Sequence, residues 1–162
     1  MPGAPKNNRL FLPELGGGSF LDVGVYPYEF VTGLMRREPD RFDISVVRGV
    51  TGVDLTTSFN MIYDNGPIAA CMSSIEVSMP SDGVICGSDG MIRHTHFYGC
   101  GTCTLYDGKG QELESFTDSE HEGFLYEIEH FASLYRNGET ESSLIPHKDT
   151  IAFAARAEEI LP

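Results

Sequence analysis

Apolar and polar residues follow two different periods along the chain. Over residues 20–35, apolar side chains recur every three or four positions, which predicts an amphipathic helix. Ser19 stands before this segment and is expected to cap its first turn. Pro27 is expected to kink the helix or restart it, because proline lacks an N–H and its ring clashes with the preceding turn. The stripe expected to face the core consists of Phe20, Val23, Tyr26, Phe30 and Leu34.

After Pro39 the period falls to two, which is the spacing of side chains along one face of a β-strand. The run Asp64-Asn65-Gly66 is a tight hairpin signal, since Asn and Gly tolerate a positive φ. Short strands separated by such turns predict an antiparallel meander. The segments expected as strands are 44–49, 56–63, 68–78, 83–87, 91–97, 103–106 and 112–116.

Helical spacing returns over residues 122–136 and 148–161. Asn137-Gly138 is expected to end the first of these helices, because glycine accepts the left-handed conformation of a helix C-terminus. A helix, then many strands, then two helices predict an α+β fold over residues 1–162 as a single domain. Its centre is expected to be an open, mostly antiparallel sheet with helices packed on one face.

Charge and composition narrow the classes of partner. The 162-residue chain carries a formal net charge of −13 and has no basic block. Such a surface repels nucleic-acid phosphates and anionic membranes, so neither is an expected partner. No apolar run approaches the ~20 residues needed to span a bilayer, and the N-terminus lacks the apolar core of a signal peptide. A cytoplasmic location is therefore expected, with the four cysteines as reduced thiols.

The densest chemical signal follows the triple glycine at residues 16–18. Asp22 and Tyr26 stand four positions apart, so on a helix both side chains lie on one face. A carboxylate beside a phenol makes a candidate proton-transfer pair. The alternative is that Asp22 only complements the dipole at the helix N-terminus and that Tyr26 belongs to the core. The spacing alone leaves both interpretations open.

The stretch GGGSFLDVGVYPYEF, residues 16–30, resembles the helix-opening motif of the Gfo/Idh/MocA oxidoreductases, approximately GGG-x-x-x-D-x-G-x-[HY]. This family includes glucose-fructose oxidoreductase, inositol dehydrogenases and dihydrodiol or xylose dehydrogenases. A tyrosine at position 26 makes the chain most similar to the dihydrodiol/xylose dehydrogenase branch. Further matching segments follow in order at Thr51–Asp54, Gly87–Ile92, Gly123–Phe131 and Gly138–Ser142.

The resemblance implies a two-domain enzyme whose Rossmann domain binds NAD or NADP and supplies a lysine. This chain has no G-x-G-x-x-G, so it is expected to be the C-terminal substrate-binding and oligomerisation domain, supplied without its Rossmann half and inactive alone. The cofactor is expected only in the full-length parent, and none on this chain by itself. The implied reaction is hydride transfer between a CH–OH carbon of a sugar-like or polyol substrate and the nicotinamide.

Four residues are expected to form the catalytic and substrate-binding site. Carried over by position, Asp22 is the family's site aspartate and Tyr26 occupies its acid/base position. Arg9, just upstream, is expected to face the substrate as a cation. Phe124 is expected to line the pocket, although a large aromatic on a helical stripe is more often part of a core.

Two alternatives to an enzyme domain stay open. The first is a non-catalytic dimerisation or binding module. The expected homo-oligomer would form through the sheet face, where Ile62, Ile68, Ala70 and Met72 would otherwise leave an apolar patch in water.

The second alternative is a small zinc protein built on His94, His96, Cys100 and Cys103. His94 and His96 are expected to share one face of a strand, and both cysteines would have to fold back onto that face. Because this geometry is unfavourable for a tetrahedral site, no metal is expected.

Overall fold

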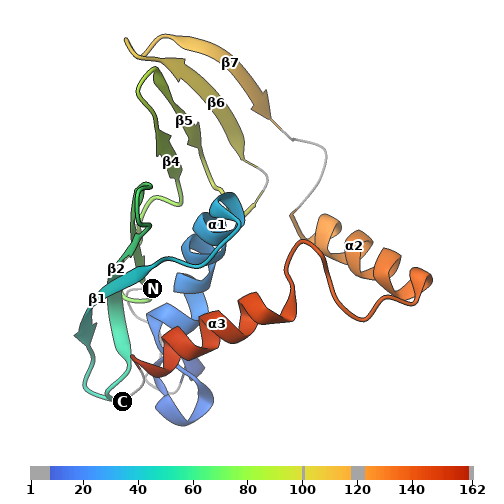
Figure 1. Cartoon of the computed structure of the whole chain (residues 1–162). Helices are drawn as coiled ribbons and strands as arrows, with labels where there is room; N and C mark the ends of the chain where they lie inside the picture. Colours follow the sequence, from blue (N-terminus) through green and yellow to red (C-terminus); the bar gives the residue numbers. More distant parts are fainter. Residues whose placement is uncertain (1–7, 100, 118–122, 161–162) are drawn as a thin grey trace. The chain divides into compact units, whose positions relative to one another are not determined.

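The computed structural model describes residues 8–99, 101–117 and 123–160 (Figure 1). The chain divides into two compact units. The first unit is Met1–Met79 with Ser143–Pro162, and the second unit is Pro80–Ser142. Helices and antiparallel strands occur in both units, so the predicted α+β class is confirmed. The expectation of one domain over residues 1–162 stays a prediction.

The sheet of the first unit has the strand order β1-β2-β3, with all neighbours antiparallel. Its strands are β1 (Arg41–Arg48), β2 (Asp54–Ile62) and β3 (Ile68–Ser74). Asn65 lies in the β2–β3 turn with φ 55°, as the Asn-Gly signal predicts. β3 is shorter than expected because the Ser74 hydroxyl oxygen accepts hydrogen bonds from the backbone N–H of Glu76 and Val77, which turns the chain out of the ladder.

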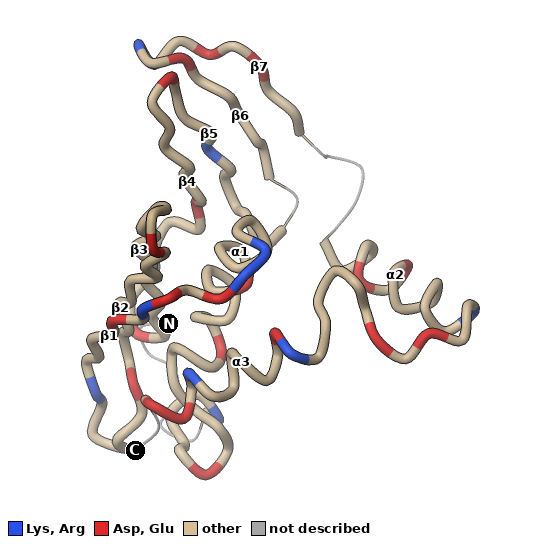
Figure 2. The backbone as a smooth tube through the Cα atoms, viewed as in Figure 1, with Lys and Arg blue, Asp and Glu red and all other residues tan. Residues whose placement is uncertain are grey.

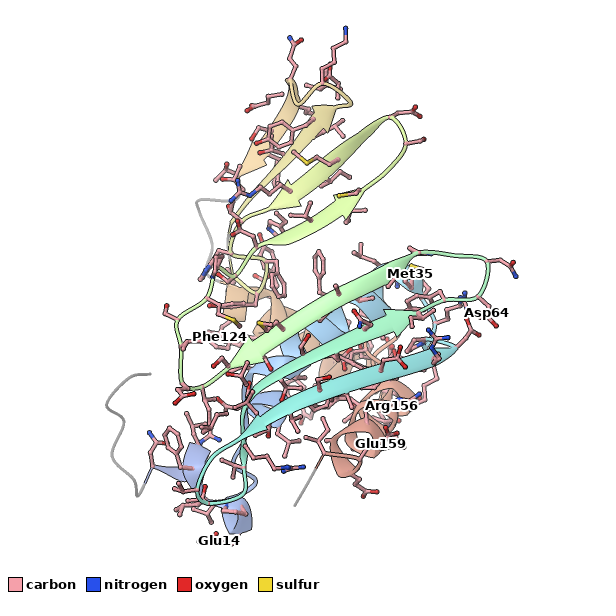
Figure 3. The ribbon with its side chains drawn as sticks, turned by 90° about the vertical axis from the view of Figure 1, so that its left-hand side faces the viewer. Glu14, Met35, Asp64, Phe124, Arg156 and Glu159 are labelled. Atoms are coloured by element: carbon pink, nitrogen blue, oxygen red, sulfur yellow. The ribbon has the colours of Figure 1, made fainter. Side chains whose placement is uncertain are left out.

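Helical elements cover one face of this sheet (Figure 3). They are the π-helical turn η3 (Phe20–Gly24), α1 (Val25–Met35) and α3 (His147–Glu158). The 3₁₀ turns η1 (Arg9–Phe11) and η2 (Pro13–Leu15) precede them along the chain. Pro27 is the third residue of α1, in the first turn, where its missing N–H breaks no bond within that helix. α1 begins at Val25 and continues directly from η3, so the expected kink or restart at Pro27 itself is not seen.

The hydrophobic core of the first unit joins the helices to the sheet. The Phe20 ring lies edge-on to Phe59 at 5.3 Å between centroids and is stacked on Phe153 at 5.1 Å. Such aromatic pairs stabilise a core beyond their buried area. The buried members are Phe20, Tyr28, Phe59, Met61, Tyr63, Phe153, Ala157 and Ile160.

The stripe predicted for the first helix is wrong after Phe20. The buried positions are Phe20, Gly24, Tyr28 and Thr32, whereas Tyr26 and Leu34 are exposed. The π-helical turn contains one residue more than an α-helical turn, so every position after it is shifted around the axis. The side chain that enters the core is therefore Tyr28 and not Tyr26.

The second unit contains a separate sheet with the order β4-β5-β6-β7. The antiparallel meander is confirmed, but it is divided into two ladders of three and four strands. The elements are β4 (Gly83–Cys86), β5 (Gly90–His94), β6 (Thr102–Asp107), β7 (Glu112–Thr117) and α2 (Gly123–Asn137). Gly138 follows α2 with φ 69°, the left-handed stop that the sequence predicts. None of the side chains of α2 is buried.

Acidic residues are distributed over helices, strands and turns, and the few basic residues form no continuous block (Figure 2). This distribution agrees with the net charge of −13. Within the described chain, no helix combines the length and the apolar character needed to cross a membrane.

Candidate functional site

The triple glycine forms a bend that brings the N-terminal segment against the start of η3. Gly16 and Gly18 have φ values of 68° and 131°, which favour glycine. The backbone N–H of Gly17 donates to the Leu12 carbonyl at 3.0 Å, and that of Gly18 donates to the Leu10 carbonyl at 3.0 Å. A Cβ on Gly17 would lie 2.7 Å from the Leu10 carbonyl oxygen. The bend therefore requires a residue without a side chain.

The start of η3 is capped from β2 and not by its own N-terminal residue. The Phe20 N–H donates to Oδ2 of Asp54 at 2.7 Å. The expected cap, Ser19, makes no capping bond; instead its hydroxyl donates to the Ser73 hydroxyl at 2.8 Å, in a fully buried contact. The predicted role of Ser19 is therefore wrong, because its hydroxyl is used between the helix and β3. In the sequence, Thr51–Asp54 stands out only as a family match, and no local signal indicates a function for Asp54.

The structure brings Arg9 and Asp22 together. A guanidinium nitrogen of Arg9 lies 2.5 Å from Oδ1 of Asp22. The Asp22 side chain is 25% exposed and that of Arg9 is 61% exposed. An ion pair this open contributes at most ~1 kcal/mol to stability, so its main effect is to hold the carboxylate and the cation at one place on the surface.

Tyr26 is the second residue of α1, directly after the π-helical turn that carries Asp22. It is 44% exposed, so its phenol is not part of the core. Tyr28 takes that place: it is fully buried and its hydroxyl donates to a carboxylate oxygen of Glu38. Burial, followed by the Glu38 bond and charge, raises the pKa of Tyr28 well above its usual range. Tyr28 is therefore held protonated inside the core, whereas the Tyr26 side chain lies at the surface.

Phe124 belongs to the first turn of α2 in the second unit. It is 69% exposed, so the core interpretation of this residue is wrong for the described chain. A cavity of 240 Å³ in the same unit is lined by Tyr126 of α2, Phe116 of β7 and Cys103 of β6, but not by Phe124. Contact between Phe124 and a substrate stays a prediction.

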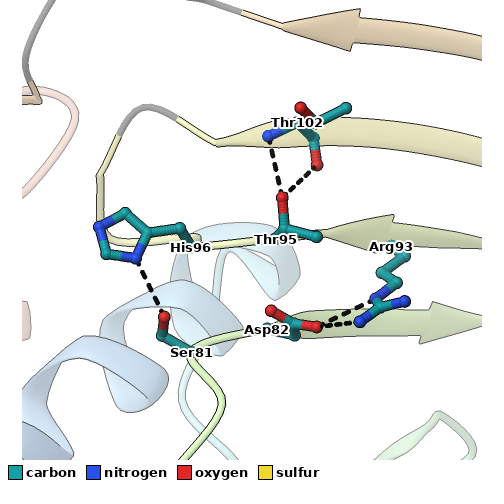
Figure 4. A network of polar contacts seen from close by, with 6 residues as sticks. All are labelled: Ser81, Asp82, Arg93, Thr95, His96 and Thr102. Carbon is teal, nitrogen blue, oxygen red and sulfur yellow. Dashed lines mark hydrogen bonds and ion pairs between the residues drawn. The ribbon is translucent and has the colours of Figure 1, made fainter.

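The histidine and cysteine residues considered for zinc lie around the turn after β5. His94 ends β5 and is paired with Cys103 of β6, as predicted for strand residues. His96 has left the strand: its φ is 54° and its Nδ1 lies 3.1 Å from the Ser81 hydroxyl (Figure 4). The two histidines therefore do not share a strand face.

Hydrogen bonds between neighbouring side chains and backbone fix the turn after β5. Arg93 donates through Nε to Asp82 at 3.0 Å, and the Thr102 N–H donates to the Thr95 hydroxyl at 3.1 Å (Figure 4). Cys100 lies outside the described residues. Among those that are described, no group of three or more His, Cys, Asp or Glu side chains is placed to hold a metal ion.

The described strands form no parallel βαβ unit of the kind that binds dinucleotides. Both sheets are antiparallel, whereas the glycine-rich phosphate loop belongs to a parallel βαβ unit. The Gly16–Gly18 bend is occupied by Asp54 and by the backbone of residues 9–12. The described part of the chain therefore offers an acid, a cation and a phenol, and the expectation that it binds no dinucleotide by itself stays a prediction.

Comparison with known proteins identifies sequences and structures that resemble this chain. Residues 1–93 match the family model of the GFO/IDH/MocA C-terminal domain. The trans-1,2-dihydrobenzene-1,2-diol dehydrogenase of Xenopus laevis is 31% identical over 155 residues, which cover 91% of this chain and 47% of that protein. The enzyme of the same name from Homo sapiens is 25% identical over 151 residues, covering 89% of this chain and 45% of that protein.

Solved structures share the fold. The aldose-aldose oxidoreductase from Caulobacter crescentus superposes with a TM-score of 0.80 at 20% identity, covering 98% of this chain and 48% of that one. KijD10, a 3-ketoreductase from Actinomadura kijaniata in complex with NADP and TDP-benzene, gives a TM-score of 0.78 at 20% identity, covering 99% of this chain and 50% of that one. The chain spans about half the length of the relatives it matches. The resemblance of the triple-glycine motif is thus confirmed, and the chain belongs to the GFO/IDH/MocA C-terminal domain family.

Proposed function

We propose that this domain forms the substrate side of a nicotinamide-dependent dehydrogenase that acts on a CH–OH group of a sugar-like or diol substrate. The observation that carries the proposal is the exposed phenol of Tyr26, one turn beyond the ion pair of Asp22 and Arg9. The names of the relatives support the substrate class, since they describe a dehydrogenase of a dihydrobenzene diol and an aldose oxidoreductase.

The chain's residues suggest a division of roles. The Tyr26 hydroxyl takes the proton from the substrate hydroxyl in oxidation and returns it in reduction. The Asp22 carboxylate holds one edge of the Arg9 guanidinium, which has further N–H groups to donate to substrate oxygens. Phe124 belongs to the second unit, and its exposed ring is proposed only as a separate apolar contact for a sugar or diol. This places proton transfer and substrate orientation on the chain described here.

NAD or NADP is proposed as the cofactor of the full-length protein, held by a separate dinucleotide-binding domain. When bound, the nicotinamide exchanges a hydride with the substrate carbon. The NADP complex of the 3-ketoreductase, which has the same fold over this domain, supports the proposal. We expect this chain by itself to bind no dinucleotide and to turn over no substrate.

The decisive experiment uses the full-length enzyme with a panel of aldoses, polyols and cyclic diols and with both cofactors. Tyr26→Phe removes only the hydroxyl and is expected to lower kcat by about 10²–10⁴-fold, the usual contribution of a general acid or base. Tyr135→Phe, at a strongly exposed position on α2, is the matched control and should keep the wild-type rate. Wild-type activity in Tyr26→Phe would contradict the assignment.

A dimerisation module is the second candidate, favoured by the outer face of the first sheet. Ile68 is 68% exposed and Met72 is 53% exposed, on the edge strand β3. Ala70 between them is exposed as well, and Ile62 is paired with Ile68 across the ladder. An apolar row of this kind is suited to a second copy of the chain, so we propose a homo-oligomer formed through this face.

Sedimentation at micromolar concentrations tests this contact. The wild type is expected to form dimers or larger assemblies, and Met72→Lys should shift it towards the monomer. Asp43→Lys, at a position on the same sheet face that is already polar, serves as the control. If the wild type is a monomer at these concentrations, the proposed interface is contradicted. A dimer without dehydrogenase activity in the full-length protein would instead favour the non-catalytic module.

A reducing, cytoplasmic location is part of the same proposal. Three cysteines of the described chain, Cys71, Cys86 and Cys103, are free thiols. Free thiols, one of them exposed, are typical of proteins kept in a reducing compartment. Fractionation of the source cells with antibody detection would check the location.

A further inference from the structure

We propose that Asp54 is a positioning residue that fixes the direction of the helix carrying Asp22 and Tyr26. The inference rests on the proposed function, because it concerns how the candidate acid/base is held. Asp54 begins β2 and is separated by 34 residues from its partner in the helix. It touches no part of the candidate site itself and acts through the backbone of η3.

Two donors converge on one oxygen of Asp54. The Phe20 N–H donates to Oδ2 at 2.7 Å, and the Thr57 hydroxyl donates to the same oxygen at 2.5 Å. Asp54 and Thr57 are both buried. A buried carboxylate needs such donors, since an unpaired one would carry a large desolvation cost. The position of the carboxylate is therefore set by β2, and it in turn sets the position of Phe20.

The second oxygen of Asp54 faces the glycine bend. A Cβ on Gly18 would lie 2.1 Å from Oδ1 of Asp54, and Gly18 has a φ of 131°. Any side chain at position 18 would displace the carboxylate or the bend. The glycine bend therefore leaves room for the Asp54 carboxylate. Gly18 must lack a side chain because Asp54, far along the chain, lies against it.

The helix needs this external acceptor. The first N–H groups of a helix have no partner within it, and a carboxylate at that end also complements the helix dipole. Ser19 supplies no cap, because its hydroxyl binds Ser73 of β3. Asp54 and Ser73 thus attach the start of η3 to two neighbouring strands. Since Phe20 also stacks in the core, the rotation of the turn that follows is fixed, and with it the direction of Asp22 and Tyr26.

The test compares Asp54→Ala with Asp54→Asn in the full-length enzyme. Asn keeps an oxygen that can accept from the Phe20 N–H, whereas Ala removes it. We expect Asp54→Ala to lower kcat about 100-fold, the cost of a misplacement of about 1 Å, with the KM of the nicotinamide cofactor changed less than about twofold. Asp54→Asn should recover most of kcat.

Met61→Ala is the control for a purely structural effect, because Met61 is fully buried on the same strand. It should lower thermal stability as much as Asp54→Ala while keeping kcat at a temperature where all variants are folded. The proposal is overturned if Met61→Ala loses kcat equally, or if Asp54→Asn is no better than Asp54→Ala.

A second measurement separates this proposal from the proposed function. With ¹⁵N-Phe and ¹³C-Asp labels in the full-length protein, the Phe20 amide and the Asp22 carboxyl resonances should both shift in Asp54→Ala and stay near their wild-type positions in Asp54→Asn. An unshifted Phe20 amide in Asp54→Ala overturns the positioning role. If the wild type proves inactive on every substrate, the proposed function fails, and these resonances still decide whether Asp54 positions the helix.

Discussion

The two units of the chain use similar sequence patterns with opposite results. In the first unit, α1 and α3 bury aromatic and aliphatic side chains against β1–β3, and the rings of Phe20, Phe59 and Phe153 lie in contact. In the second unit, α2 has an apolar stripe but none of its side chains is buried. An amphipathic pattern thus predicts a helix reliably, but it does not say whether that helix has something to pack against.

This difference matters for where the candidate site lies. Asp22 and Tyr26 project from elements whose other sides are part of the packed core, so their positions are fixed by the interior. A catalytic group needs such support, because a small displacement costs much of its effect. The second unit, with few buried apolar contacts, is expected to open locally at lower free energy than the first.

The largest contrast is expected from matched aromatic truncations. Phe59→Ala should lower the free energy of unfolding by about 3–5 kcal/mol, because the ring is fully buried and its loss leaves a cavity. Phe131→Ala, at a position that is 71% exposed on α2, should change it by less than about 0.5 kcal/mol. Urea denaturation of both variants measures the difference. Equal losses would show that α2 is packed as well as β2.

The cysteines give a second contrast, in reactivity. Burial raises the pKa of Cys71 on β3 to about 11, so at pH 8 only about one thiol in a thousand is the reactive thiolate. Cys86, at the end of β4, is exposed. Iodoacetamide should label Cys86 at least about 100-fold faster than Cys71, as followed by mass spectrometry of the two peptides. If Cys71 and Cys86 were labelled at similar rates in the native protein, and both rates rose equally in urea, then β3 would not protect Cys71 from the reagent.

The smallest effect concerns the carboxyl of Glu29, a partly exposed residue of α1 in the first unit. Burial, followed by the charges of Asp149 and Glu38, raises the pKa of Glu29. The folded state therefore binds the proton of the Glu29 carboxyl more tightly than the unfolded state does. The contribution of Glu29 to the free energy of unfolding is fully present below the unfolded pKa, and it is lost as the pH rises through the folded pKa. Glu29→Gln should thus stabilise the protein at pH 7, by less than about 1 kcal/mol because the group is partly exposed.

At pH values below about 4 this gain should vanish, since wild-type Glu29 is then protonated too. Urea denaturation at the two pH values is the measurement. Glu129→Gln, at an exposed position on α2, is the control and should have no comparable pH-dependent effect. A loss of stability in Glu29→Gln at pH 7 would contradict the assigned cause.

Much of the local structure could be predicted from the sequence, because its causes are local. The strands and helices were expected within a few residues of their observed bounds, and the left-handed Asn65 and Gly138 were expected from residue type alone. The expectation that His96 lies in a strand is wrong, because the residue types around it do not indicate its positive φ. The division into two ladders also escaped prediction, because a meander pattern does not say where neighbouring strands stop pairing.

The candidate site was predicted only in part. Asp22 and Tyr26 stand out through the motif and Arg9 through its place just upstream, whereas the ion pair between Arg9 and Asp22 is seen only in the folded chain. The phase of the helix was wrong because a π-helical turn leaves no mark on a pattern read with a period of 3.6. Asp54 was missed as a cap because its partner lies 34 residues away, and only the folded chain brings the two together.

The π-helical turn at Phe20–Gly24 also has an evolutionary consequence. It is equivalent to one residue inserted into an α-helix, whose residues each turn by about 100°. Losing the codon of Leu21 or of Val23, which keeps Asp22, would restore regular winding and rotate every later position of the helix by about 100°. Such a deletion would turn Tyr28 and Thr32 away from the core together with the side chain at position 26, so the length of this turn ties the direction of Tyr26 to the packing of α1.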